Sequence, residues 1–191
     1  TPMHFQTRRL VIRDFTEEDF TAPHPPVGSA GDHPPQPFDL RDGDAVRAQI
    51  RHARVTAKDD PRLVFDLAIT RKPDGMLIGR GGVERNPDEP REGFIWLLSD
   101  PATWNQGLTH EAAEGLLACC FGTLGLHRVT SECDPASAGA LELMKTLGLR
   151  REATFVENSW VGGQWVDTAV FALLDREWKA RAAVSATPPA R

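Results

Sequence analysis

The sequence predicts a mixed α/β fold, in which helices flank a mostly antiparallel sheet of about seven strands. Two features of the sequence favour this class. Segments that alternate between apolar and polar residues are interleaved with segments whose apolar residues recur at the spacing of a helix. In addition, Gly162 and Gly163 separate the last two strand segments, and such a pair is typical of a two-residue hairpin turn.

Length and composition limit the number of domains and the classes of protein to which the chain can belong. At 191 residues, the chain is expected to form a single domain over residues 1–178, followed by a flexible tail over residues 179–191. The net charge of −5 argues against a general nucleic-acid binder, and no apolar run is long enough to cross a membrane. The three cysteines suggest no disulfide framework. We therefore expect a cytoplasmic protein that binds neither nucleic acid nor membrane.

The first part of the chain predicts a strand, two helices and a long loop. Residues 8–15 alternate as a strand, and residues 16–20 read as a short helix with a start that resembles a capping box. Proline and glycine then crowd residues 23–39, which can be neither helix nor central strand, so we expect a loop insertion there. Residues 42–56 follow as a polar helix with a narrow apolar stripe.

The middle of the chain predicts three consecutive strands, at residues 63–70, 76–86 and 94–99. A Pro-Asp-Gly turn separates the first two, so we expect them to pair as neighbours. Glycines interrupt the second strand and suggest a bulge or a close approach of another element.

A polar loop with one glycine connects the third of these strands to a helix. Gly107 precedes the helix, Thr109 is the candidate N-cap and Gly125 ends the helical pattern. The N–H groups at a helix N-terminus can hold a phosphate or pyrophosphate where a glycine allows close approach. The alternative is that Gly107 serves only the turn from strand to helix.

The last part of the chain predicts a strand, a helix, a hairpin and a final helix. Residues 127–134 alternate as a strand, and Ser137 is the N-cap of a helix that ends at Gly148. In the hairpin around the glycine pair, Trp160 is expected to lie opposite Trp165.

With this order of elements, the chain resembles the GNAT acyltransferase superfamily, and in particular its ribosomal-protein-alanine N-acetyltransferase-like branch. Two motifs carry the resemblance, which covers nearly the whole chain. The segment WNQGLTHEA is similar to the family's acetyl-CoA motif and matches it at Gly107, Glu111 and Ala112. The segment SAGALELMKTLGL has the length of the family's next motif, with its Leu147 and Gly148 in register.

The sequence departs from the family pattern in places that bear on catalysis. Trp104 stands where the superfamily has Gln or Arg, and Thr109 where Gly or Ala is usual. Ala140 replaces a serine that lies near the coenzyme A sulfur in relatives. The chain also contains no tyrosine, the general acid of many members of the superfamily.

The resemblance implies acetyl-CoA as a co-substrate and a sheet that splays at the strand over residues 94–99. A backbone N–H near Leu97 or Leu98 would polarise the thioester carbonyl, and the free edge of that strand would bond the pantetheine. The implied binding residues are Leu97, Leu98, Ser99, Trp104, Asn105, Gln106, Gly107, Leu108, Thr109, Ser137 and Met144.

Acyl transfer to an amine also needs a base for the amine proton and an acid for the departing thiolate. Glu92 begins the strand before the coenzyme loop, close to where the superfamily often places its base, and Glu132 on the next strand is the rival. Ser137 or water could protonate the thiolate. No cluster of residues has the spacing of a metal site, so we expect that no metal is needed.

Two functions remain open from the sequence. The first is an N-acetyltransferase that acts on a protein N-terminus or a small-molecule amine. The second is a catalytically silent module that binds coenzyme A or regulates, which the loss of the serine and of tyrosine favours. The protein is expected to be a monomer or a homodimer.

Overall fold

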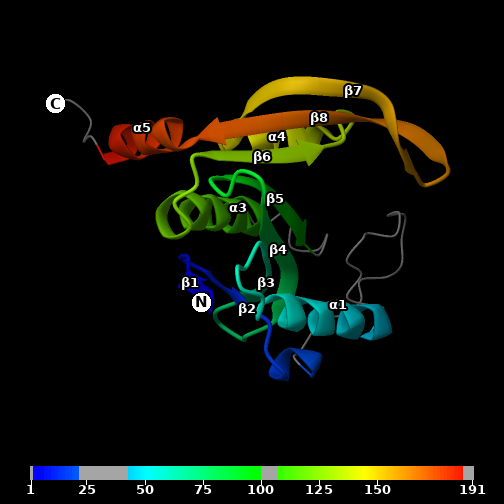
Figure 1. The fold of residues 1–191 in the computed structure, drawn as a ribbon, viewed down its shortest axis with the longest axis vertical. Coiled ribbons are helices and arrows are strands. Elements are labelled where there is room, and N and C mark those ends of the chain that lie inside the picture. The colour runs from blue at the N-terminus through cyan, green and yellow to red at the C-terminus, as the bar shows by residue number, and fades with distance from the viewer. Residues whose placement is uncertain (1, 22–42, 100–106, 187–191) are drawn as a thin grey trace.

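The computed structural model describes residues 2–21, 43–99 and 107–186, and its fold is an open sheet of eight strands flanked by helices (Figure 1). The strands are β1 (His4–Gln6), β2 (Leu10–Asp14), β3 (Val64–Arg71), β4 (Leu77–Arg85), β5 (Glu92–Ser99), β6 (Arg128–Cys133), β7 (Arg150–Val161) and β8 (Gln164–Leu174). The longer helices are α1 (Gly43–Thr56), α3 (Leu108–Ala118), α4 (Ala138–Thr146) and α5 (Asp175–Ala186).

The spatial order of the strands is β1-β2-β3-β4-β5-β6-β8-β7, and only the β5–β6 pair is parallel. The predicted class, a mixed α/β fold with a mostly antiparallel sheet, is confirmed. The sequence missed β1, which pairs with β2 over three residues and is too short to show a clear alternation. The predicted loop insertion over residues 23–39 lies entirely outside the described residues.

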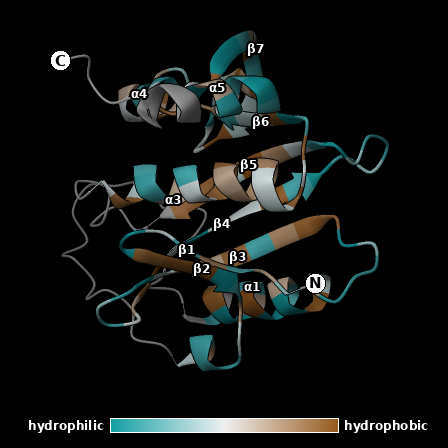
Figure 2. Ribbon diagram, turned by 90° about the vertical axis from the view of Figure 1, so that its left-hand side faces the viewer, coloured by the Kyte–Doolittle hydropathy of each residue, from teal (hydrophilic) through white to brown (hydrophobic). Residues whose placement is uncertain are grey.

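Helices cover both faces of the sheet. The helix α3 packs on one face, where Leu116 and Leu117 join the larger core. The helix α1 packs on the other face, where Val46 and Ile50 form a second, smaller core. Figure 2 shows the largely apolar strands β2 and β3 between α1 and α3, and residues of β3 contribute to both cores. Among the described residues, no helix is long and apolar enough to span a membrane.

The strands β5 and β6 pair along only part of their length. The paired residues run from Glu92 opposite Arg128 to Phe94 opposite Thr130. Beyond them the pairing ends, although both strands continue. At the end of the paired part, the Ser131 hydroxyl donates a hydrogen bond to the Ile95 carbonyl at 3.0 Å. The two strands therefore diverge beyond this point and leave an opening in the sheet.

The glycines of β4 serve close packing, as the sequence suggested. A Cβ on Gly81 would lie within 3.0 Å of side-chain atoms of Leu97 and Leu116, on the α3 side. A Cβ on Gly82 would lie 2.3 Å from the Phe65 carbonyl oxygen and 2.7 Å from the Trp96 ring. Leu97 and Trp96 therefore stand on opposite faces of the sheet, as alternation along β5 requires.

The ends of α3 differ in part from the prediction. Thr109 is not the N-cap, because the helix begins at Leu108 and the cap is Gly107, in the left-handed conformation with φ of 69°. A glycine adopts this conformation without steric cost, and no local pattern in the sequence distinguishes it from a glycine that only ends a turn. At the other end, the helix widens into a π-helical turn at Cys119–Thr123 before Gly125.

The C-terminal half follows the predicted elements closely. The Ser137 hydroxyl accepts a hydrogen bond from the Ala140 N–H at 3.3 Å, so the predicted N-cap of α4 is confirmed. In the β7–β8 hairpin, Trp160 lies opposite Trp165 as expected. The last helix, α5, extends to Ala186, past the residue at which the domain was expected to end.

Candidate active site

A cavity of about 620 Å³ lies where β5 and β6 diverge, between α3 and α4. It is lined by residues of β5, the start of α3, the end of β6 and α4: Phe94, Ile95, Trp96, Leu97, Leu98, Gly107, Thr109, His110, Ala113, Leu116, Ser131, Glu132, Cys133, Gly139, Ala140, Glu142, Leu143, Met144, Thr146 and Leu147. The diverging strands thus form one wall of a space that two helices close.

The structure brings most of the described residues that we expected to bind the cofactor to this cavity. Leu97, Leu98, Gly107, Thr109 and Met144 line it. Leu108 does not, because its side chain is buried in the core beneath α3. Ser137 is not among the lining residues either, and its hydroxyl oxygen caps α4.

Three further expected residues fall outside the part of the chain that the structure describes, namely Trp104, Asn105 and Gln106. Ser99 is the last residue of β5, opposite Gly79.

Gly107, the N-cap of α3, places the start of this helix beside the cavity. Gly107 has a φ of 69°, and among the described residues the only atom near a Cβ placed there would be Arg9 Nη2 at 3.5 Å. The left-handed backbone conformation is therefore the reason for a glycine at this position. The N-terminal N–H groups of α3 follow it directly, and they give this end of the cavity a partial positive charge.

Glu92 does not reach the cavity. It lies on the paired part of β5, where Arg128 Nε donates to its Oε1 at 2.9 Å and Asn86 Nδ2 to its Oε2 at 3.2 Å. Arg128 also donates to Glu152 at 2.6 Å, and bonds from Arg128 and Arg150 lower the pKa of Glu152 to about 2. Glu92 thus belongs to a network of ion pairs at the closed end of the opening.

Glu132, the second candidate base, lies at the cavity. It stands on β6 beyond the last residue paired with β5, and it lines the cavity with an exposed side chain. Its neighbour Ser131 is buried, so alternation turns Glu132 toward the α1 face of the sheet. No other described residue forms a hydrogen bond or ion pair with this carboxylate, which leaves it available to a substrate.

Trp96 forms a second polar feature on the α1 face, which sequence reasoning missed. The Arg80 guanidinium lies over the indole, 4.8 Å from the ring centroid. Arg80 Nε donates to Asp66 Oδ1 at 3.1 Å, and burial raises the pKa of Asp66 although Arg80 opposes this shift. The Trp96 Nε1 atom is buried and has no hydrogen-bond partner among the described residues.

The cysteine at the cavity is a poor nucleophile. Burial and the neighbouring Asp134 raise the pKa of the Cys133 thiol, so it stays protonated at neutral pH. The other two cysteines, Cys119 and Cys120, are consecutive in the sequence and buried, and burial raises the pKa of Cys119 to about 11. In the part of the chain that the structure describes, no three His, Cys, Asp or Glu residues gather as metal ligands. Independence from metal stays a prediction.

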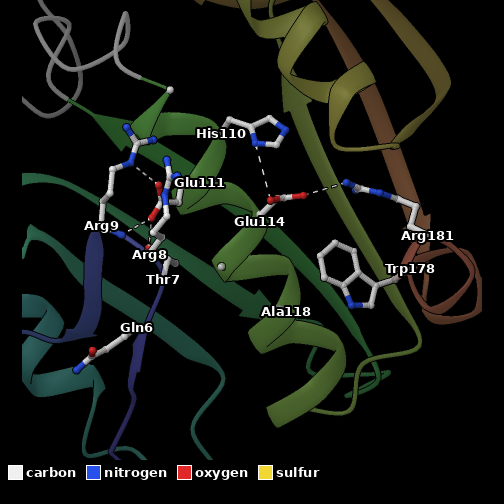
Figure 3. A pocket seen from close by; sticks show the side chains of 12 residues that line it. Gln6, Thr7, Arg8, Arg9, His110, Glu111, Glu114, Ala118, Trp178 and Arg181 are labelled. Carbon is white, nitrogen blue, oxygen red and sulfur yellow. Dashed lines mark hydrogen bonds and ion pairs between the residues drawn. The ribbon is translucent and has the colours of Figure 1, made fainter. Parts of the chain in front are cut away.

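A second cavity of about 660 Å³ lies along α3, between the turn that joins β1 to β2 and the helix α5 (Figure 3). Its charges are largely paired. The Glu111 carboxylate accepts hydrogen bonds from Thr7 Oγ1 at 2.5 Å and from Arg9 N and Nε at 2.6 Å. Glu114 accepts one from Arg181 at 2.9 Å, and His110 lies 3.9 Å away.

The Glu111 contacts position the first turn of α3. Burial alone would raise the pKa of Glu111, but the bonds from Thr7 and Arg9 outweigh it and lower the pKa below its usual value. The carboxylate thus ties α3 to the turn before β2. Glu111, one of the motif residues, therefore holds the Gly107 end of the helix in place and does not line the first cavity.

Comparison with known proteins identifies relatives of this chain. A family model described as "Acetyltransferase (GNAT) domain" matches residues 9–150. The uncharacterized N-acetyltransferase YnaD of Bacillus subtilis (strain 168) is 27% identical over 176 residues, which are 92% of this chain and 99% of that protein.

Solved structures share the fold. An acetyltransferase of the GNAT family from Bacillus anthracis has a TM-score of 0.72 and 23% identity, and the match covers 92% of this chain and 100% of the other. Mutant forms of the spermidine/spermine N-acetyltransferase SpeG from Vibrio cholerae have a TM-score of 0.63 and 18% identity, over 71% and 77% of the two chains.

Proposed function

This chain belongs to the GNAT acetyltransferase family and is an acetyl-CoA-dependent acyltransferase, and we propose that it acetylates a primary amine at the opening between β5 and β6. The acceptor is a protein N-terminal α-amine or a small-molecule amine, which attacks directly in a ternary complex. The observation that carries the proposal is the opening itself. At this opening, Glu132 and Trp96 line the cavity that lies between α3 and α4. Both residues belong to the α1 face of the sheet, so the opening connects the two faces.

The residues around the cavity fit acetyl-CoA. The N–H groups that follow Gly107 suit a pyrophosphate, because a helix N-terminus favours an anion and needs no further charge. Beyond the Ile95 carbonyl, which the Ser131 hydroxyl bonds, no described strand pairs with the edge of β5 that faces β6, so its amide groups can bond the pantetheine chain. The apolar side chains of Leu97 and Met144 would flank that chain.

The unpaired edge of β5 also supplies the group that activates the acetyl donor. A backbone N–H at Leu97 or Leu98 can donate to the carbonyl oxygen, on which negative charge develops as the amine attacks. A preorganised donor of this kind contributes about 3 kcal/mol of transition-state stabilisation.

Glu132 is the base in this proposal. The attacking amine must lose its proton, and the Glu132 carboxylate can accept it directly or through one water molecule. Glu92 is engaged by Arg128 and Asn86 at the closed end of the opening. Since Ser137 is turned to the cap of α4, we assign the protonation of the departing thiolate to water.

The experiment is a measurement of thiol release from acetyl-CoA with a panel of amines. The panel should contain peptides with free N-termini, the same peptides with blocked N-termini, and polyamines, because the spermidine/spermine acetyltransferase shares this fold. We expect amine-dependent release that requires a free primary amine. Tight binding of acetyl-CoA without release by any amine would instead indicate the silent binding module.

A further inference from the structure

Ser131 is an unusual residue for a buried position in the wall of the active-site cavity. Five polar or charged residues are buried in the described part of the chain, namely Asp19, Arg62, Asp66, Thr70 and Ser131. Of these five, only Ser131 lines the cavity between α3 and α4. A buried hydroxyl costs free energy unless it is hydrogen-bonded, so the partner of this hydroxyl indicates what the residue does there.

The Ser131 hydroxyl is bonded at the point where β5 and β6 separate. The last register pair is Phe94 with Thr130, so Ile95 and Ser131 would form the next pair if the ladder continued. In place of that pair, the Ser131 side chain donates to the Ile95 carbonyl oxygen at 3.0 Å, and this bond is buried. A side chain therefore takes the position of a backbone donor at the end of the ladder.

This bond satisfies the Ile95 carbonyl without bringing the two backbones together. A buried carbonyl that lacks a partner is costly, and in a parallel pair its usual partner is a backbone N–H of the neighbouring strand. Without the Ser131 hydroxyl, the Ile95 carbonyl would need that N–H, and the strands would be drawn into further pairing. Further pairing would occupy the edge of β5 that the proposed function assigns to acetyl-CoA.

The groups that act on acetyl-CoA in the proposed function come directly after this bond. Leu97 and Leu98 follow Ile95 on the same strand, and a backbone N–H there donates to the thioester carbonyl. Such a donor must lie about 2.7–3.1 Å from the developing oxyanion, and a misplacement of about 1 Å can cost roughly 10²-fold in rate. The place at which β5 leaves β6 therefore decides whether these N–H groups are aligned.

We propose that Ser131 is a positioning residue for acetyl transfer, an inference that rests on the proposed function. Its hydroxyl ends the β5–β6 ladder at Ile95, fixes the place of the opening and so aligns the N–H groups of Leu97 and Leu98. Ser131 is not the acid for the departing thiolate, because its proton is donated to the Ile95 carbonyl. The residue acts on the reaction through the backbone of β5.

Thr130 offers a matched control on the same strand. Its hydroxyl also donates to a β5 carbonyl, that of Gly93 at 3.4 Å, but within the paired part of the ladder. Thr130→Val removes this bond at nearly constant side-chain volume and leaves the end of the ladder unchanged. Ser131→Ala removes the bond at the end of the ladder, whereas Ser131→Thr retains a hydroxyl there.

Steady-state kinetics with acetyl-CoA and an amine that the parent accepts test the proposal. Ser131→Ala should lower kcat by about tenfold or more, because the N–H groups lose their alignment. Ser131→Thr should recover most of that loss, and Thr130→Val should keep kcat within about twofold of the parent. Thermal melts of all three variants should show folded proteins, so that a fall in kcat is not a result of unfolding.

Hydrogen exchange supplies a readout that needs no turnover. Ser131→Ala should slow the exchange of the β5 amides that face β6 beyond Ile95, because the strands pair further, and Thr130→Val should not. If the parent releases thiol with an amine, equal kcat values for Ser131→Ala and Thr130→Val overturn the proposal. If no amine is accepted, the proposed function fails by itself. Exchange in Ser131→Ala that is no slower than in the parent then overturns the role of Ser131 as well.

Discussion

Arg128 Nε donates a hydrogen bond to Glu92 Oε1 at 2.9 Å, and these two residues form the first register pair of the parallel strands β5 and β6. The ion pair therefore stands at the closed end of the opening, while Glu132 stands beyond the last paired residue. Two carboxylates on neighbouring strands thus have separate tasks. One joins the strands, and the other faces the proposed reaction.

This separation predicts opposite effects for two matched substitutions. Glu132→Gln should lower the turnover rate by about 10²–10⁴, the usual contribution of a general base, with little change in acetyl-CoA affinity. Glu92→Gln should leave the rate within a few-fold of the parent and lower the free energy of unfolding by about 1 kcal/mol or less. Steady-state kinetics and urea unfolding measure both. A large loss of rate in the Glu92 variant alone would return the role of base to that residue.

The backbone of Gly107 provides a second prediction. Gly107→Ala should weaken acetyl-CoA binding, because its φ of 69° costs an L-residue about 1 kcal/mol or more and shifts the start of α3. Gly107→Asn should lose less acetyl-CoA affinity, since asparagine tolerates the left-handed conformation better than alanine does. Gly122→Ala is the control, at a helical glycine with open space around it. Equal affinities of the Gly107 and Gly122 variants in calorimetry would contradict the assignment.

The hydrogen bonds to Glu111 make a pH-dependent contribution to stability. Its pKa in the folded protein lies below the ordinary value of 4.5, so the ionised carboxylate stabilises the fold above that pH. This contribution is lost as the pH falls through the folded-state pKa. Glu111→Gln should therefore lower the free energy of unfolding by roughly 1–3 kcal/mol at neutral pH.

The same variant should differ progressively less from the parent as the pH falls through the folded-state pKa of Glu111, below which the parent carboxylate is also neutral. Urea unfolding at several pH values measures the difference. A gap between the two proteins that stays constant with pH would show that the carboxylate charge does not anchor α3.

The packing of Gly82 against Trp96 predicts a strong effect on stability. Gly82→Ala would place its Cβ 2.3 Å from the Phe65 carbonyl oxygen, which is backbone and cannot turn aside. We expect a loss of about 1–3 kcal/mol in the free energy of unfolding, as is usual for overpacking. Gly122→Ala again serves as the control. A thermal melt in which the Gly82 variant matches the parent would contradict the described contact.

Local patterns predicted the elements of the site but not all of its members. The strand, the glycine loop and the helix α3 follow one another in sequence, so periodicity and composition were enough to predict them. The choice between Glu92 and Glu132 depended on where β5 and β6 stop pairing. That is a relation between strands that no local pattern reports.

The same limit explains the features that were missed. Asp66, Arg80 and Trp96 come from three strands and meet only through the register of β3, β4 and β5. The predicted cap at Thr109 was wrong because the left-handed conformation of Gly107 starts the helix one residue earlier. By contrast, the N-cap at Ser137 was predicted correctly, because its hydrogen bond spans only three residues.

A crystal structure with bound coenzyme A tests the central claim most directly, because two cavities of similar size adjoin α3 in the part of the chain that the structure describes. Our account predicts the pyrophosphate on the N–H groups that follow Gly107 and the pantetheine along Leu97 and Leu98. The sulfur should lie where β5 and β6 diverge, within reach of an amine held near Glu132. Coenzyme A bound instead in the outer cavity beside Arg9 and Arg181, with the opening empty, would contradict the account.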